Sequence, residues 1–206
     1  MANVIVVGEL SKGELASHVY ELTTLARELG SQVDVVISSK DGIEKQNIAS
    51  ALGAYGVSKV HLINCGTGLS GAALAGYIAG IISDGDIAIG PQTYLGRDVI
   101  SHLSVLLDKS VLSNATNASL NGTTLTTEHA IFGGTQIVKA QLNSSPALVL
   151  LRPKSVTPQE GGALTAELVE VDALDSIESS QSTEIVSSEV NTSDGPELED
   201  ATVVVT

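Results

Sequence analysis

The sequence predicts a three-layer α/β fold, in which a mostly parallel sheet is covered by helices and continues into an antiparallel extension. Two observations predict it. In the first half, short aliphatic runs alternate with segments whose apolar residues recur at helical spacing. After about residue 110 the helical segments cease, and further strand-like runs are separated only by short turns.

Four buried strands are expected in the first half, each followed by a helix. The strands are 3–7, 33–38, 60–63 and 86–90, and the helices are 14–29, 42–52, 71–82 and 96–107. The strands are rich in Val and Ile, as is typical of strands covered on both faces. Gly30 and Gly53 follow the first two helices, and glycine often ends a helix. The short connections favour right-handed crossovers between parallel strands.

The second half is expected to contain strands without intervening helices. The runs are 111–117, 123–128, 135–140 and 147–151. The pairs Asn121-Gly122 and Gly133-Gly134 are turn signals that predict hairpins. Three later pieces, 164–171, 183–190 and 201–206, also have the pattern of strands.

Charge divides the chain into two parts. Residues 1–154 carry 12 acidic residues and 10 Lys or Arg, whereas residues 155–206 carry 12 acidic residues and no Lys or Arg. Pro153 and Pro158 mark an exit from the compact body. We therefore expect an α/β domain at 1–154 and an acidic connecting segment with strands at 155–206.

Composition limits the classes of function. An acidic chain repels phosphates, which argues against nucleic acid or an anionic membrane as a partner. A single cysteine and four scattered histidines provide no ligand set for a metal. No apolar run approaches the roughly 20 residues needed to span a bilayer, and the start does not resemble a signal peptide. We expect a soluble, cytoplasmic protein without membrane insertion.

The loop Gly90–Asp98 is the main candidate for a ligand site. It follows the fourth strand and opens a helix, where ligands of open α/β sheets bind. Thr93 and the backbone amides near Gly96 could hold an anion, with Arg97 pairing with it. The alternative is structural: Asp98 caps its helix and pairs with Arg97 to shape an interface. We favour this structural interpretation, because caps and local pairs are commoner than sites.

Two other motifs are weaker candidates for a functional site. The pattern G-x-G-x-x-G at 66–71 opens a helix, but it follows the third strand and lacks an acid at the end of a strand about 20 residues later. A flexible loop is therefore favoured over dinucleotide binding. Cys65 has no neighbouring base oriented by a third group, so we interpret it as a small buried residue. No nucleophile–base pair is visible, so no catalytic residue is expected and a hydrolase has little support.

Several segments carry a family likeness in their order and spacing. They are LARELG (25–30), LGAYGVSKVHLIN (52–64), GPQTYLGRD (90–98), VLSNATNAS (111–119), IFGGTQIVKAQ (131–141), ALVLLRPKS (147–155) and PELEDATVVVT (196–206). Together they resemble the alpha subunits of electron transfer flavoproteins over nearly the whole chain. The resemblance implies a Rossmann-like N-terminal domain of the adenine nucleotide alpha hydrolase-like type.

The resemblance also implies a role in electron transfer. The family is a heterodimer that carries electrons from acyl-CoA dehydrogenases, as in fatty acid β-oxidation, and from other dehydrogenases to a quinone oxidoreductase of the respiratory chain or another acceptor. FAD lies in the C-terminal domain of the alpha subunit, covered by the beta subunit. For this chain the resemblance implies an electron carrier rather than an enzyme. The chain would be the scaffold that contacts the beta subunit, and it would hold no tightly bound FAD of its own. We expect the FAD domain to be absent, since the sequence stops at Thr206, before the family's Gly-rich, Arg-containing loop.

The sequence departs from the family pattern at three places. His102 stands where the family usually has a basic residue, Asn114 where it has an acid, and His129–Phe132 where it has Arg-Pro-x-Tyr. Contacts that depend on those charges are therefore in question, while the fold is not. An alternative function is a stand-alone adenine-nucleotide-binding module of the same fold, in which the loop at 90–98 takes a phosphate.

Overall fold

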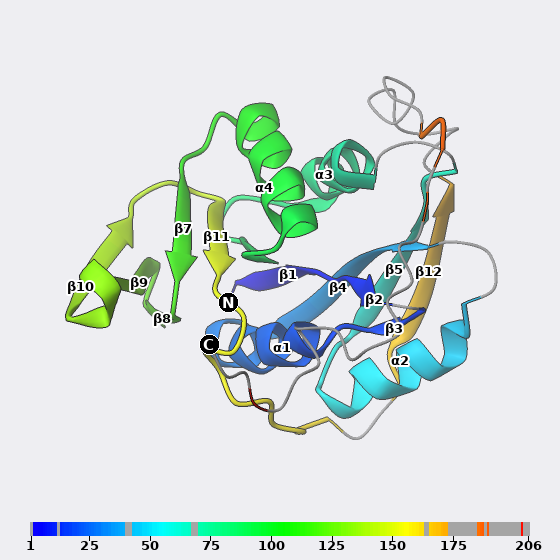
Figure 1. The fold of residues 1–206 in the computed structure, drawn as a ribbon, viewed down its shortest axis with the longest axis horizontal. Coiled ribbons are helices and arrows are strands. Elements are labelled where there is room, and N and C mark those ends of the chain that lie inside the picture. Colours follow the sequence, from blue (N-terminus) through cyan, green and yellow to red (C-terminus); the bar gives the residue numbers. More distant parts are fainter. Residues whose placement is uncertain are drawn as a thin grey trace.

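A seven-stranded sheet with helices on both faces forms the body of the protein (Figure 1). The computed structural model describes residues 2–11, 13–39, 43–66, 70–162 and 165–172, with 185–187, 189 and 203. The strands of the sheet are β1 (Asn3–Val7), β4 (Gln32–Ser39), β5 (Lys59–Asn64), β6 (Ile87–Pro91), β7 (Val111–Ala115), β11 (Ala147–Leu151) and β12 (Glu167–Asp172). Their order is β12-β5-β4-β1-β6-β11-β7, and every pair is parallel.

The helices divide between the two faces and enclose two layers of core. They are α1 (Ser17–Leu29), α2 (Lys45–Ala54), α3 (Ser70–Ile81) and α4 (Tyr94–Leu107). Successive residues of β1 enter opposite layers, as the period of a strand requires: Val4 and Val6 pack with α1, whereas Ile5 and Val7 pack with α3 and α4. Figure 1 shows α1 and α2 below the sheet and α3 and α4 above it. The three-layer α/β class predicted from the sequence is confirmed.

The boundaries of the first two helices differ from the prediction. Helix α1 begins at Ser17 rather than at residue 14, because β3 (Glu14–Leu15) pairs with β2 (Leu10–Ser11) in a small antiparallel ladder. Helix α2 continues through Gly53 to Ala54. The turn after it needs a glycine at Gly56 instead, where φ is +80°.

The antiparallel strands form a sheet of their own, which corrects the expected mixed sheet. The strands are β8 (Asn117–Asn121), β9 (Thr124–Ile131) and β10 (Gln136–Leu142), in the order β10-β9-β8, and η1 (Phe132–Gly134) lies between the last two. Both predicted hairpin turns are present. The expected strand 111–117 is divided because Asn114 has a φ of +59° and the Thr116 amide donates to the carbonyl of Glu128. The chain therefore leaves the parallel sheet there and enters the second sheet.

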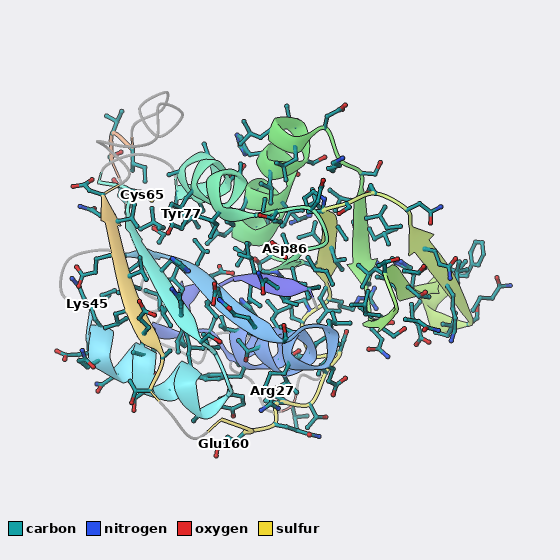
Figure 2. All side chains as sticks on the ribbon, turned by 180° about the vertical axis from the view of Figure 1, so that it is seen from behind. Arg27, Lys45, Cys65, Tyr77, Asp86 and Glu160 are labelled. Atoms are coloured by element: carbon teal, nitrogen blue, oxygen red, sulfur yellow. The ribbon has the colours of Figure 1, made fainter. Side chains whose placement is uncertain are left out.

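Strand β12 extends the parallel sheet beyond residue 154. It pairs with the edge of β5 and corresponds to the strand expected at 164–171. The chain leading to it crosses α1, where the Arg27 guanidinium donates to the carbonyl of Gln159 at 2.9 Å (Figure 2). Of the later expected strands, only Ile185–Ser187, Glu189 and Val203 are described, and none of these residues is in a strand. A separate connecting segment at 155–206 stays a prediction.

None of the helices in the described part of the chain combines the length and the apolar character that a membrane-spanning helix needs.

Candidate functional site at the β1–β6 switch point

The sheet reverses its direction of growth between β1 and β6. From β1 the chain adds β4 and β5 on one side, and then returns to place β6 on the other side. The carboxyl ends of two such strands open a crevice where α/β proteins commonly bind ligands. Gly8 and Glu9 follow β1 here, and Gln92 and Thr93 follow β6. The loop selected from the sequence, 90–98, therefore lies at the switch point.

Thr93 is the cap of α4. Its hydroxyl oxygen accepts from the Gly96 amide at 3.1 Å, and its carbonyl accepts from the Arg97 amide at 3.1 Å. The expectation that Asp98 caps this helix is wrong, because the helix begins earlier, at Tyr94. Gly96 is required by packing, because a Cβ there would collide with the carbonyl oxygen of Pro91. The Gly96 amide donates to the Thr93 hydroxyl oxygen, so it is not free to bind a ligand.

Arg97 and Asp98 point to different neighbours, so their expected pairing is also wrong. The Arg97 guanidinium stacks on the ring of Tyr94, 5.0 Å from the centroid, and donates to the Thr93 carbonyl at 3.2 Å. The Asp98 carboxylate lies 3.4 Å from Nδ1 of His102. It also packs so closely on α3 that a Cβ at Gly71 would collide with it. Adjacent residues of a helix do not face each other, which explains the separation.

Two residues that the sequence analysis did not select complete the site. Glu9 Oε2 lies 3.2 Å from Nε2 of His18, which stands in the first turn of α1. Both side chains are largely covered, with 26% of Glu9 and 13% of His18 exposed. The Thr93 hydroxyl also acts on the pKa of this carboxyl. A glutamate directly after the glycine that ends the first strand is the signal that could have indicated it.

The neighbours of Glu9 favour its ionised form. The contact with His18 lowers the pKa of the Glu9 carboxyl, burial acts in the opposite direction, and the Thr93 hydroxyl adds to the lowering. The net effect is a pKa below the ordinary value for glutamate. His18 Nε2 faces the Glu9 carboxylate, and no hydrogen bond joins it to the Thr93 hydroxyl among the described residues. The arrangement holds a charge and does not generate a nucleophile.

The remaining sequence candidates lie elsewhere. Cys65 is buried after β5, and burial raises the pKa of its thiol, as suits a packing residue. Residues 67–69 of the G-x-G-x-x-G pattern lie outside the described residues, and the pattern resumes at Ser70 and Gly71 in α3. Nδ1 of the buried His61, on β5, meets the hydroxyl of Tyr77, on α3, at 2.8 Å.

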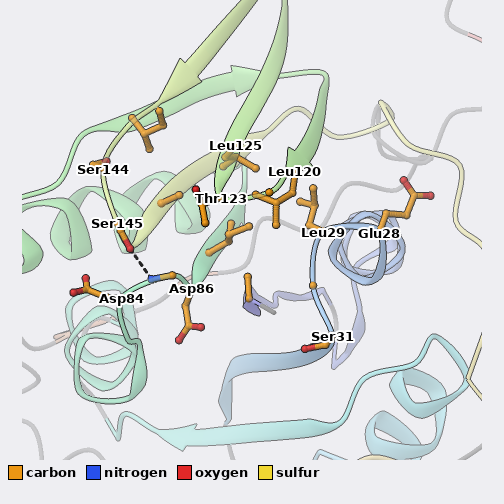
Figure 3. Close-up of a pocket in the computed structure, with 17 residues that line it drawn as sticks. Glu28, Leu29, Ser31, Asp84, Asp86, Leu120, Thr123, Leu125, Ser144 and Ser145 are labelled. Atoms are coloured by element: carbon orange, nitrogen blue, oxygen red, sulfur yellow. Dashed lines mark hydrogen bonds between the residues drawn. The ribbon is translucent and has the colours of Figure 1, made fainter.

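A cavity of about 670 Å³ opens at the opposite, amino-terminal edge of the sheet (Figure 3). Its walls combine leucines of the three-stranded sheet and α1 with acidic residues. Asp86 accepts from the amides of Asn3 and Ser83 at 3.0 and 2.9 Å, and the Gly85 amide donates to Ser145. These hydrogen bonds join the amino-terminal ends of β1, β6 and β11. We therefore interpret these polar groups at the cavity as structural.

The fold and the switch point define a class. This is a doubly wound α/β domain of nucleotide-binding architecture, whose switch point holds an acidic side chain of its own. The family model for the electron transfer flavoprotein domain matches residues 4–176, and the chain belongs to that family.

A relative in Bacillus subtilis (strain 168) is named electron transfer flavoprotein subunit alpha. It is 26% identical over 207 residues, which cover 98% of this chain and 62% of the relative. The chain thus spans less than two thirds of that relative's length. The likeness to the alpha subunits stated from the sequence is confirmed.

Proposed function

We propose that this chain is the scaffold part of an electron transfer flavoprotein alpha subunit, which packs against a beta subunit and does not itself hold the flavin. The observation that carries the proposal is the family match, which spans the parallel sheet from β1 to β12. In this role the complex carries electrons from acyl-CoA and other dehydrogenases toward a quinone oxidoreductase in the cytoplasm. FAD belongs to a C-terminal domain, and the protein is a carrier rather than an enzyme.

The β9–β10 hairpin supports a role in contacting another subunit. Ile137 and Val138 are 57% and 42% exposed, and successive residues of a strand point to opposite faces. Phe132, at the tip, is 75% exposed. The hairpin thus exposes large apolar side chains on both faces and at its tip, and exposed apolar surface is a mark of interaction sites. Strand β10 is also the edge of its sheet, so its outer backbone can accept a further strand.

Charge favours a partner other than a second copy. Each chain carries a formal net charge of −14, so two copies repel each other. The hairpin itself is balanced, since Lys139 on β10 pairs with Glu128 on β9 at 3.0 Å. A beta subunit without a strong negative charge therefore fits this surface better than another copy does.

Co-expression with an electron transfer flavoprotein beta subunit tests the proposal. The tagged chain should capture the beta subunit in a one-to-one complex. The isolated chain should show no flavin absorbance in the visible range. Failure to capture the beta subunit would contradict the scaffold role, and a stoichiometric flavin in the isolated chain would contradict the proposed division between the domains.

A further inference from the structure

We infer that the cavity at the amino-terminal edge of the sheet binds a small aliphatic amine in its ammonium form. The inference goes beyond the scaffold role and does not depend on it. Three features of the cavity carry it: an apolar wall, the sign of the charges around it, and a buried hydroxyl that has no partner.

The apolar wall is the first feature. The cavity has a volume of about 670 Å³, which lies within the range of about 300–1,000 Å³ that is typical of sites for small molecules. A leucine from each of four elements lines it: Leu29 of α1, Leu120 of β8, Leu125 of β9 and Leu142 of β10. Leu120 and Leu142 pack against the core but stay partly exposed. A ligand with an apolar body would remove this surface from water, which favours binding.

The sign of the charge is the second feature. Glu28, Asp84 and Asp86 line the cavity, and no Lys, Arg or His is among the described residues that do so. Both carboxylate oxygens of Asp86 accept backbone amides of the chain. Glu28 and Asp84 are exposed, and within the described part of the chain neither makes a hydrogen bond or an ion pair. Figure 3 shows these two on opposite sides of Leu120, so free carboxylates flank the leucines.

The ends of two helices add to this negative field. Helix α1 ends at Leu29, which lines the cavity, and α3 ends at Ile81, shortly before Asp84. The C-terminal end of a helix carries a partial negative charge, which favours a cation. The cavity should therefore accept a cationic ligand and reject a carboxylate or a phosphate.

Ser144 provides the third feature. Its side chain lines the cavity, and its hydroxyl oxygen is buried without a hydrogen-bond partner among the described residues. Most buried polar groups have a partner. An ammonium group carries three N–H donors and no acceptor, so it can donate to this oxygen. A ligand with an aliphatic body and an ammonium head matches the leucines, the charges and the hydroxyl together.

Calorimetry on the full 206-residue chain tests the inference with three probes that share one apolar body: hexylammonium, hexanol and hexanoate. At millimolar concentrations hexylammonium should bind about tenfold or more tightly than hexanol, and hexanoate should not bind. Butylammonium, which is two methylenes shorter, should bind about tenfold more weakly than hexylammonium. Equal binding of the three six-carbon probes, or no binding of hexylammonium, would overturn the inference. These measurements use the unaltered chain, so they do not depend on the folding of a variant.

Glu28→Gln combined with Asp84→Asn tests whether the amine binds in this cavity. The double variant removes both free charges, so hexylammonium should bind about threefold or more weakly, while the affinity for hexanol stays unchanged. The matched control is Glu14→Gln with Glu44→Gln, which removes two exposed charges of β3 and of the start of α2, outside the cavity. An equal loss in the control would overturn the inference, because net charge alone would then explain it. A folded Glu28→Gln, Asp84→Asn variant with the full preference for hexylammonium would also overturn it. A failure of beta-subunit capture would leave the inference untouched.

Discussion

His18 Nε2 lies 3.2 Å from Glu9 Oε2, and this contact joins the end of β1 to the first turn of α1. Both atoms are buried, and their angle is not that of a regular hydrogen bond. Electrostatic attraction depends less on angle than a hydrogen bond does, so the contact depends on the ionisation of Glu9. The stability of the fold should therefore respond to pH through Glu9.

Glu9→Gln should destabilise the chain at neutral pH by about 1–3 kcal/mol, because it removes the charge of a largely covered carboxylate that lies beside His18. The pKa of Glu9 is lower in the folded state, so its contribution is present above the ordinary glutamate pKa and is lost as pH falls through the folded value. Urea unfolding at several pH values, from neutral to acidic, measures this. The difference between the two proteins should shrink on acidification; a difference independent of pH would contradict it.

Gly96→Ala should destabilise the chain by about 1–3 kcal/mol, because the new Cβ has to displace the backbone of Pro91. Gly80 is the matched control. It lies in α3, where a Cβ would meet nothing within 4 Å, so Gly80→Ala should stabilise by about 0.5–1 kcal/mol. Thermal unfolding of both variants measures the contrast. Equal shifts in the same direction would show that the approach of Gly96 to Pro91 is not a constraint.

Ile137→Asp combined with Val138→Asp should weaken capture of the beta subunit at least about tenfold, because a charge would enter the interface on each face of the hairpin. Both positions are exposed, so the melting temperature should stay nearly unchanged. The matched control is Val105→Asp, on α4, where the side chain is 81% exposed. Full capture by the double variant would show that the beta subunit binds elsewhere than at the β9–β10 hairpin. It would not contradict the scaffold role.

Tyr77→Phe should destabilise the chain by about 1–3 kcal/mol, because it removes the hydroxyl partner of a buried imidazole. Tyr94→Phe provides the comparison. That ring is 88% exposed and keeps its stacking with Arg97, so the change in stability should be within about 0.5 kcal/mol. Denaturant unfolding separates the two, and an equally small effect at Tyr77 would show that His61 is satisfied in another way.

The alternating strands and helices were predictable because they depend on the local pattern of apolar residues. Val and Ile runs followed by helical spacing predicted β1 through α4 to within a few residues, and Asn121-Gly122 and Gly133-Gly134 predicted the hairpins. The site was predictable only in part. The loop at 90–98 was placed correctly between a strand and the start of a helix, yet Arg97 and Asp98 were assigned the wrong neighbours. The cap depends on where α4 begins, and helix boundaries are the least certain feature of a pattern.

The α/β class, the hairpins and the position of the loop follow from periodicity and turn residues, which act over a few neighbouring positions. Tertiary structure alone decided which distant groups meet. The Asn3 amide reaches Asp86 because β1 and β6 are neighbours, β12 pairs with β5 across about a hundred residues, and β8 to β10 form a separate sheet. Strand order and register arise from burying the whole core at once, and no short stretch of sequence contains that information.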